Sequence, residues 1–200
     1  MLIHETNSCV FNITESDLSF ETIYKKKYFP KEISEVKSAN VLLIPDENLR
    51  ENLGITFPET TLEFFEYLKE NSDDNFVPDI AVTDEDFKKF NMHSDLVYLA
   101  SVVCTAVVLP IVINLVSSFL YDLANKFLKK EEELSADINI YVQDDKNGKS
   151  LKFHYKGPVK GIKKVLNEGA LKSFKDMYVE NDDGIDLKKK KRKLLNNGKN

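Results

Sequence analysis

Residues 96–121 read LVYLASVVCTAVVLPIVINLVSSFLY, a stretch that contains no Asp, Glu, Lys, Arg or His. Twenty of these 26 residues are apolar. About 20 residues of α-helix cross the hydrocarbon core of a bilayer, at ~1.5 Å per residue. The stretch is therefore long enough to span a membrane, and it decides between a membrane protein and a protein with a long buried segment.

The membrane interpretation predicts one apolar helical segment over residues 95–130. Lys126 and the lysines that follow it are placed to anchor the helix at a membrane surface, and Tyr98 and Tyr121 lie near its two ends. Spaced along this segment, the residues expected to face lipid or a partner subunit are Leu96, Leu99, Val103, Val107, Ile111, Leu115 and Phe119.

A second interpretation of the same residues is a pair of adjoining helices buried on a protein core. Polar residues recur at steps of three and four beyond Pro110, which is typical of an amphipathic helix. These residues are Asn114, Ser117, Ser118, Asp122 and Asn125. Pro110 then begins the second helix, because proline is tolerated in a first helical turn.

The charge of the chain is divided around this stretch. Residues 1–95 carry 9 basic and 20 acidic side chains, whereas residues 122–200 carry 19 basic and 13 acidic ones. The acidic half would repel nucleic acid, and the basic half suits phosphates or anionic lipid. The two cysteines imply no disulfide framework, and the N-terminus lacks a signal-peptide pattern. These features predict a bacterial inner-membrane or cytoplasmic protein that is not secreted.

The N-terminal part predicts a small α/β lobe over residues 1–90. Short apolar runs at 9–14, 40–44 and 79–83 are bounded by polar residues or proline, as strands are. Residues 58–70 begin with Pro58 and Glu59 and continue with apolar residues at helical spacing. Strand 40–44, helix 58–70 and strand 79–83 are expected to form one parallel βαβ unit with a right-handed crossover.

The C-terminal part predicts a hairpin-and-helix lobe over residues 134–176. The strands are expected at 138–142 and 151–155, with an Asn-Gly turn signal between them. Apolar residues at helical spacing follow from 159 to 174, and residues 181–200 form a polar, basic tail typical of disorder. The predicted fold class is α+β (or α/β): a βαβ-containing lobe, a long apolar helical segment, and a hairpin with a helix.

One group of acids has a pattern that carries chemistry. Asp46 follows the strand that ends at residue 44, and Asp84 and Asp86 follow the strand that ends at residue 83. Open α/β sheets bind ligands at the carboxyl ends of their strands, and carboxylates gathered there can hold Mg²⁺. The alternative hypothesis is that these acids cap helices and solvate turns. Residues 84–86 resemble the D-x-D pair of the Toprim nucleases and topoisomerases, which implies metal-dependent phosphoryl chemistry.

A dense cation cluster lies in the tail, at Lys188, Lys189, Lys190, Lys191, Arg192 and Lys193. It is able to contact an anionic surface, either a membrane or a nucleic acid. A solvated chain end explains the same residues. No aromatic residue is interleaved with the cations, which disfavours sequence-specific RNA recognition.

The layout of residues 95–170 resembles the effector-associated accessory modules of bacterial conflict and antiviral systems. It runs from the apolar segment through a basic linker at 126–130 to INIYVQDDKNGKSLKFHYKG and then PVKGIKKVL. The resemblance implies a non-enzymatic adaptor or a membrane-linked partner.

Together these features predict a non-catalytic, membrane-associated or oligomerising accessory protein, with bacterial defence as one setting and no cofactor. Its partner would be a membrane or a protein bound through the apolar segment, with a homo-oligomer expected if the chain is soluble. The second hypothesis is a soluble Mg²⁺-dependent nuclease-like or nucleotide-handling domain that uses Asp46, Asp84 and Asp86.

Overall fold

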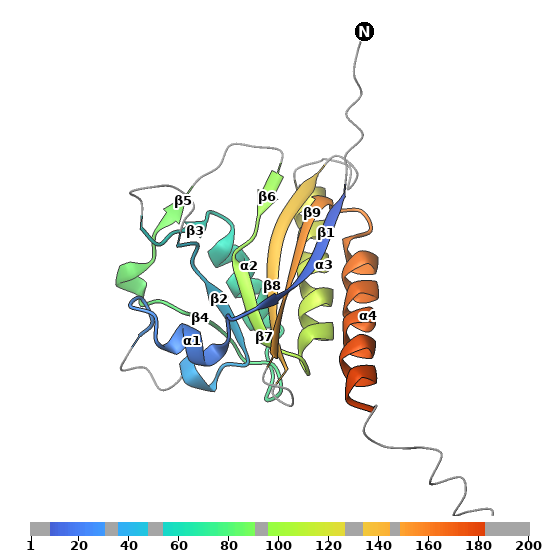
Figure 1. The fold of residues 1–200 in the computed structure, drawn as a ribbon. Coiled ribbons are helices and arrows are strands. Elements are labelled where there is room, and N and C mark those ends of the chain that lie inside the picture. Colours follow the sequence, from blue (N-terminus) through green and yellow to red (C-terminus); the bar gives the residue numbers. More distant parts are fainter. Residues whose placement is uncertain are drawn as a thin grey trace, which may run out of the picture. The chain divides into compact units, whose positions relative to one another are not determined.

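The structure, a computed structural model, describes residues 9–30, 36–47, 54–90, 96–126, 134–144 and 149–182. The chain divides into two compact units, residues 1–166 and 167–200. Helices and strands alternate irregularly along the sequence (Figure 1), which confirms the predicted α+β class.

The described strands are β1 (Val10–Ser16), β2 (Val41–Ile44), β3 (Phe57–Pro58), β4 (Pro78–Ile80), β5 (Lys89–Phe90), β6 (Leu96–Tyr98), β7 (Ser101–Thr105), β8 (Ser135–Asp144) and β9 (Lys149–Pro158). The described α-helices are α1 (Phe20–Tyr24), α2 (Thr61–Glu70), α3 (Leu109–Lys126) and α4 (Ile162–Asp182). Two 3₁₀ turns join them, η1 (Val36–Ser38) and η2 (Asp84–Asp86).

Seven of the strands form one mixed sheet in the order β1-β9-β8-β7-β2-β4, and β6 also pairs with β8. The strands β2 and β4 are parallel, as are β7 and β8, whereas β2 with β7, β8 with β9 and β1 with β9 are antiparallel. The remaining two strands, β3 and β5, form a small sheet of their own.

The predicted βαβ unit is confirmed as β2, α2 and β4. In the parallel register, Val41 pairs with Pro78 and Leu43 with Ile80. All four residues of β2 are buried, as expected for a strand covered on both faces. The helix α2 turns Phe64 and Leu68 inward, so its apolar side packs on the sheet while its acidic side stays in solvent.

The uncharged stretch is not one helix, nor the pair of helices that the second interpretation expected. Eight of its first ten residues belong to β6 and β7, which pair in parallel with successive parts of β8. Between them, the Leu99 N–H donates to the Asp137 carbonyl over 3.2 Å, so the contact with β8 continues through the break. The predicted helix over residues 96–105 is wrong, because β2 and β8 flank β7 and bury it as a strand.

Only the second half of the stretch is helical. The helix α3 begins at Leu109, which places Pro110 in the first turn, where its missing N–H breaks no helical bond. This start confirms the prediction that Pro110 begins a helix. Along α3, Asn114, Asp122 and Asn125 are exposed, as predicted, but Ser117 is buried and its hydroxyl donates to the Ile113 carbonyl.

The transmembrane interpretation is wrong. Among the described residues, no helix has the length and apolar character needed to cross a membrane. The physical reason is the switch from strand to helix inside the uncharged stretch, since α3 keeps only 13 uncharged residues before Asp122. A membrane-associated function, and an oligomer built on this stretch as a single apolar helix, therefore lose the observation on which they depended.

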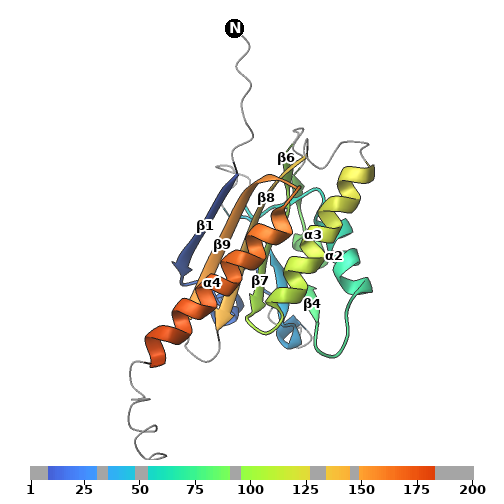
Figure 2. The same ribbon diagram turned by 90° about the vertical axis from the view of Figure 1, so that its right-hand side faces the viewer.

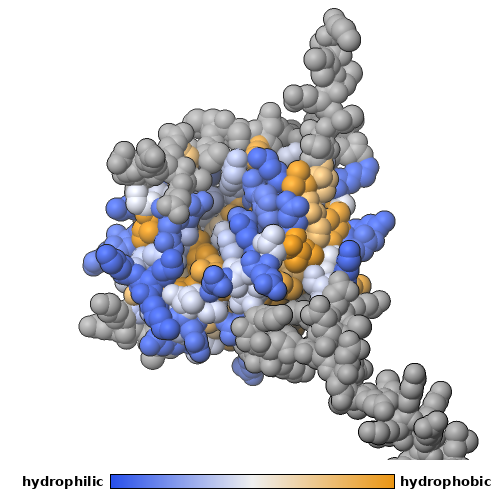
Figure 3. Space-filling model, viewed as in Figure 1, coloured by the Kyte–Doolittle hydropathy of each residue, from blue (hydrophilic) through white to orange (hydrophobic). Residues whose placement is uncertain are grey.

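The predicted hairpin is confirmed as β8 and β9, which are longer than the strands expected at 138–142 and 151–155. The crossover from β7 through α3 to β8, which the sequence did not predict, leads into it. The tip of the hairpin, with its Asn-Gly pair, lies outside the described residues. Ile138, Ile140 and Val142 point into the core, and the residues between them are half-exposed on the opposite face. In Figure 3 this opposite face is turned toward the viewer, and hydrophilic side chains lie in the middle of the view.

The helix α4 starts after Gly161, whose φ of 85° is accessible to glycine without strain. Ile162 and Leu166 in the first turns of α4 are fully buried in the first unit. On one face of the sheet, α2 and α3 lie side by side (Figure 2), and they form the floor and walls of the candidate site.

Candidate cation-binding groove between α2 and α3

Three aromatic rings join α2 to α3. The ring of Phe119 lies 5.0 Å from that of Phe64 and 5.5 Å from that of Tyr67, with interplanar angles of 43° and 51°. Tilted ring pairs at these separations contribute a stabilisation in addition to that from the apolar area they bury. Phe119 is only 3 % exposed, whereas Tyr67 is half-buried. The three rings therefore hold the two helices together, and they form an apolar floor between the helices on a side that is open to solvent.

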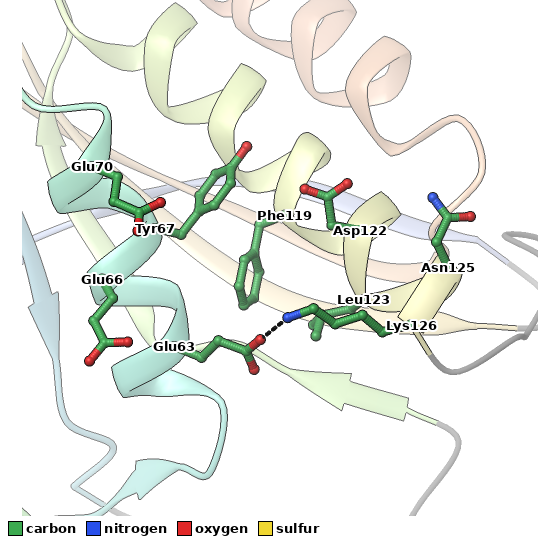
Figure 4. Close-up of a pocket in the computed structure, with 9 residues that line it drawn as sticks. All are labelled: Glu63, Glu66, Tyr67, Glu70, Phe119, Asp122, Leu123, Asn125 and Lys126. Carbon is green, nitrogen blue, oxygen red and sulfur yellow. Dashed lines mark hydrogen bonds and ion pairs between the residues drawn. The ribbon is translucent and has the colours of Figure 1, made fainter.

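Above this floor lies a groove with a volume of about 600 Å³ (Figure 4). It is lined by Glu63, Glu66, Tyr67, Glu70, Phe119, Asp122, Leu123, Asn125 and Lys126. All nine residues come from α2 and α3, so the packing of two regular helices fixes the shape of the groove.

The walls of the groove are acidic. Glu63, Glu66 and Glu70 follow each other at steps of three and four residues, which places them along one side of α2. Asp122 adds a fourth carboxylate from α3, and Lys126 is the one cation among the nine lining residues. Like charges three or four residues apart destabilise a helix slightly. The groove thus concentrates negative charge that the stability of α2 does not require.

The groove already holds an ammonium group. The Nζ of Lys126 forms an ion pair with the Oε1 of Glu63, which links the last turn of α3 to the first turn of α2. The hydrogen bond and the charge of Glu63 raise the pKa of Lys126. Desolvation opposes this shift, and the charge of Asp122 makes the smallest contribution, which also raises the pKa. Figure 4 shows Glu63 and Lys126 reaching toward each other across the groove, with Glu66 turned away from α3.

The three acids of the predicted metal site do not gather around a common point. No group of three or more His, Cys, Asp or Glu residues in the described part of the chain is arranged to hold a metal ion. Asp46 is exposed, and its backbone pairs with Thr56 in an isolated bridge. A 3₁₀ turn contains Asp84 and Asp86, in which Asp86 accepts from the Thr83 hydroxyl over 3.1 Å. This turn matches the capping alternative.

The predicted interface residues of the uncharged stretch do not share a surface. Four of them are buried in the core: Leu99, Val103, Leu115 and Phe119. Leu96 is half-buried at the start of β6, Ile111 is 40 % exposed, and Val107 is 86 % exposed in the turn before α3. Among these seven residues only Phe119 lines the groove.

The predicted anionic-surface contacts, Lys188, Lys189, Lys190, Lys191, Arg192 and Lys193, lie outside the described residues. Contact between this basic cluster and nucleic acid stays a prediction.

Sequence reasoning missed the groove, although two of its signals were present. The acids at 63, 66 and 70 lie on one side of a predicted helix, and the polar positions recognised beyond Pro110 include Asp122 and Asn125. What the sequence did not reveal is that these two polar sides face each other across the rings of Tyr67 and Phe119.

Comparison with known proteins adds no relative: no family model, curated protein or solved structure matches this chain. The resemblance to conflict-system accessory modules stays a prediction.

Proposed function

We propose that this protein is a binding module that recognises a basic peptide segment of a protein partner in the α2–α3 groove. The observation that carries the proposal is the Lys126 ammonium seated on Glu63 inside an acidic groove with an aromatic floor. Carboxylates attract guanidinium and ammonium groups, and aromatic faces add a cation–π attraction. Guanidinium groups suit both the carboxylates and the aromatic rings, because they are planar and stack on rings.

The spacing of the acids suits a peptide with repeated basic residues. Glu63 and Glu70 are seven residues apart on α2, which corresponds to about 10.5 Å along the helix axis. A polyproline II peptide advances ~3.1 Å per residue with three residues per turn, so every third side chain points the same way about 9 Å apart. Such a peptide presents arginines to the two acids in turn, whereas a single metal ion would need the carboxylates gathered at one point.

The test uses a peptide of sequence GRPPRPPRG and its matched control GQPPQPPQG, titrated into the full chain by calorimetry at an ionic strength of about 0.15 M, where the Debye length is about 8 Å. We expect the arginine peptide to bind and the glutamine peptide not to bind. The double variant Glu63→Gln/Glu70→Gln removes two groove carboxylates and is expected to weaken binding about tenfold, since exposed charge contacts are individually weak but add up.

The matched control is Glu21→Gln/Glu85→Gln, which also removes two glutamate charges, but at exposed positions outside the groove. It should leave affinity within about twofold of the unmodified chain, because charges beyond a Debye length are screened. Equal binding of the two peptides, or equal weakening by the two double variants, overturns the proposal.

A further inference from the structure

Lys126 occupies the groove without being fixed there. Its side chain is 64 % exposed and that of Glu63 is 47 % exposed, so neither end of the ion pair is held by packing. Lysine is a strongly hydrated point charge on a flexible four-carbon stem. An exposed ion pair of this kind opens readily, because solvent compensates each charge when the pair separates.

The chain also offers Lys126 a second acid on its own helix. Asp122 lies four residues before Lys126 on α3, and its charge already acts on the Lys126 ammonium. An acid placed four residues N-terminal to a lysine is the favourable orientation for a pair along a helix. Lys126 can therefore leave Glu63 and remain paired, with its ammonium turned along α3 instead of across the groove.

We propose that Lys126 is a displaceable occupant of the groove, whose ammonium holds the place on Glu63 that a partner's basic side chain takes on binding. The proposal rests on the proposed function and adds a form of regulation to it. In the free protein, Lys126 neutralises Glu63. On binding, an incoming guanidinium takes this place, and the Lys126 ammonium moves to Asp122. Affinity for the partner is then limited by competition within the chain.

The test compares Lys126→Gln with Lys69→Gln, using the same arginine peptide. Both variants remove one lysine charge from an exposed position, but Lys69 lies outside the groove, near the Phe65 ring of α2. We expect Lys126→Gln to tighten binding about fivefold and Lys69→Gln to change it by less than about twofold. Circular dichroism and thermal melting confirm that both variants fold.

A double-mutant cycle separates displacement from a general change of charge. In the Glu63→Gln background Lys126 has no partner across the groove, so adding Lys126→Gln should tighten binding no more than adding Lys69→Gln. Equal tightening by the two lysine variants in the unmodified chain, or weaker binding by Lys126→Gln, overturns the displaceable occupant. If neither the unmodified chain nor Lys126→Gln binds the arginine peptide, the proposed function itself fails.

Discussion

At the scale of single residues, Phe119 connects the core to the candidate site. Its ring contacts two rings of α2, it is almost fully buried, and it also lines the groove. The sequence placed Phe119 on the apolar side of a helix, and this is correct. It did not indicate what that side faces, because a lipid, a partner subunit and a neighbouring helix all select the same residue types.

We expect Phe119→Ala to lower the free energy of unfolding by about 3–5 kcal/mol, since it removes a buried aromatic ring and leaves a cavity. The matched control is Val107→Ala in the same uncharged stretch, where the side chain is 86 % exposed and the change should stay within about 0.5 kcal/mol. Urea unfolding followed by circular dichroism measures both. Similar losses for the two variants would contradict the burial pattern described here.

At the scale of elements, the sequence predicted best where proline or polar residues punctuate it. Pro45 and Pro58 separate β2 from α2, and the whole β2–α2–β4 unit was predicted. Between Leu96 and Leu109 no charged residue, proline or glycine marks the change from strand to helix, and Ser101 and Thr105 are the two polar residues there. A strand buried on both faces, such as β7, reads as a continuous apolar run and cannot be told from a buried helix by periodicity.

Substitution of Pro110 tests where α3 begins. Because Pro110 lies in the first turn, Pro110→Ala should change the free energy of unfolding by less than about 1 kcal/mol. Ser118→Pro, in the middle of α3, should cost about 3 kcal/mol or more. A continuous helix over residues 96–121 predicts instead that Pro110→Ala stabilises by about 3 kcal/mol, and thermal or urea unfolding distinguishes the two outcomes.

At the scale of the whole molecule, the groove exists only because two crossovers place their helices on the same face of one sheet. The Lys126–Glu63 pair joins residues 63 positions apart in the sequence. The acidic composition of the N-terminal half was visible from the start, but its concentration on one side of α2, opposite Asp122, depends on the parallel pairings β2–β4 and β7–β8. No local pattern carries that information.

Binding of a basic peptide in the α2–α3 groove is tested by titrating the ¹⁵N-labelled full chain with GRPPRPPRG and following the shifts of assigned backbone amides. We expect the perturbations to cluster on residues 63–70 of α2 and 119–126 of α3, and GQPPQPPQG to cause none. Perturbations confined to the half-exposed face of β8 and β9, or the absence of any shift at millimolar peptide, would contradict binding in this groove.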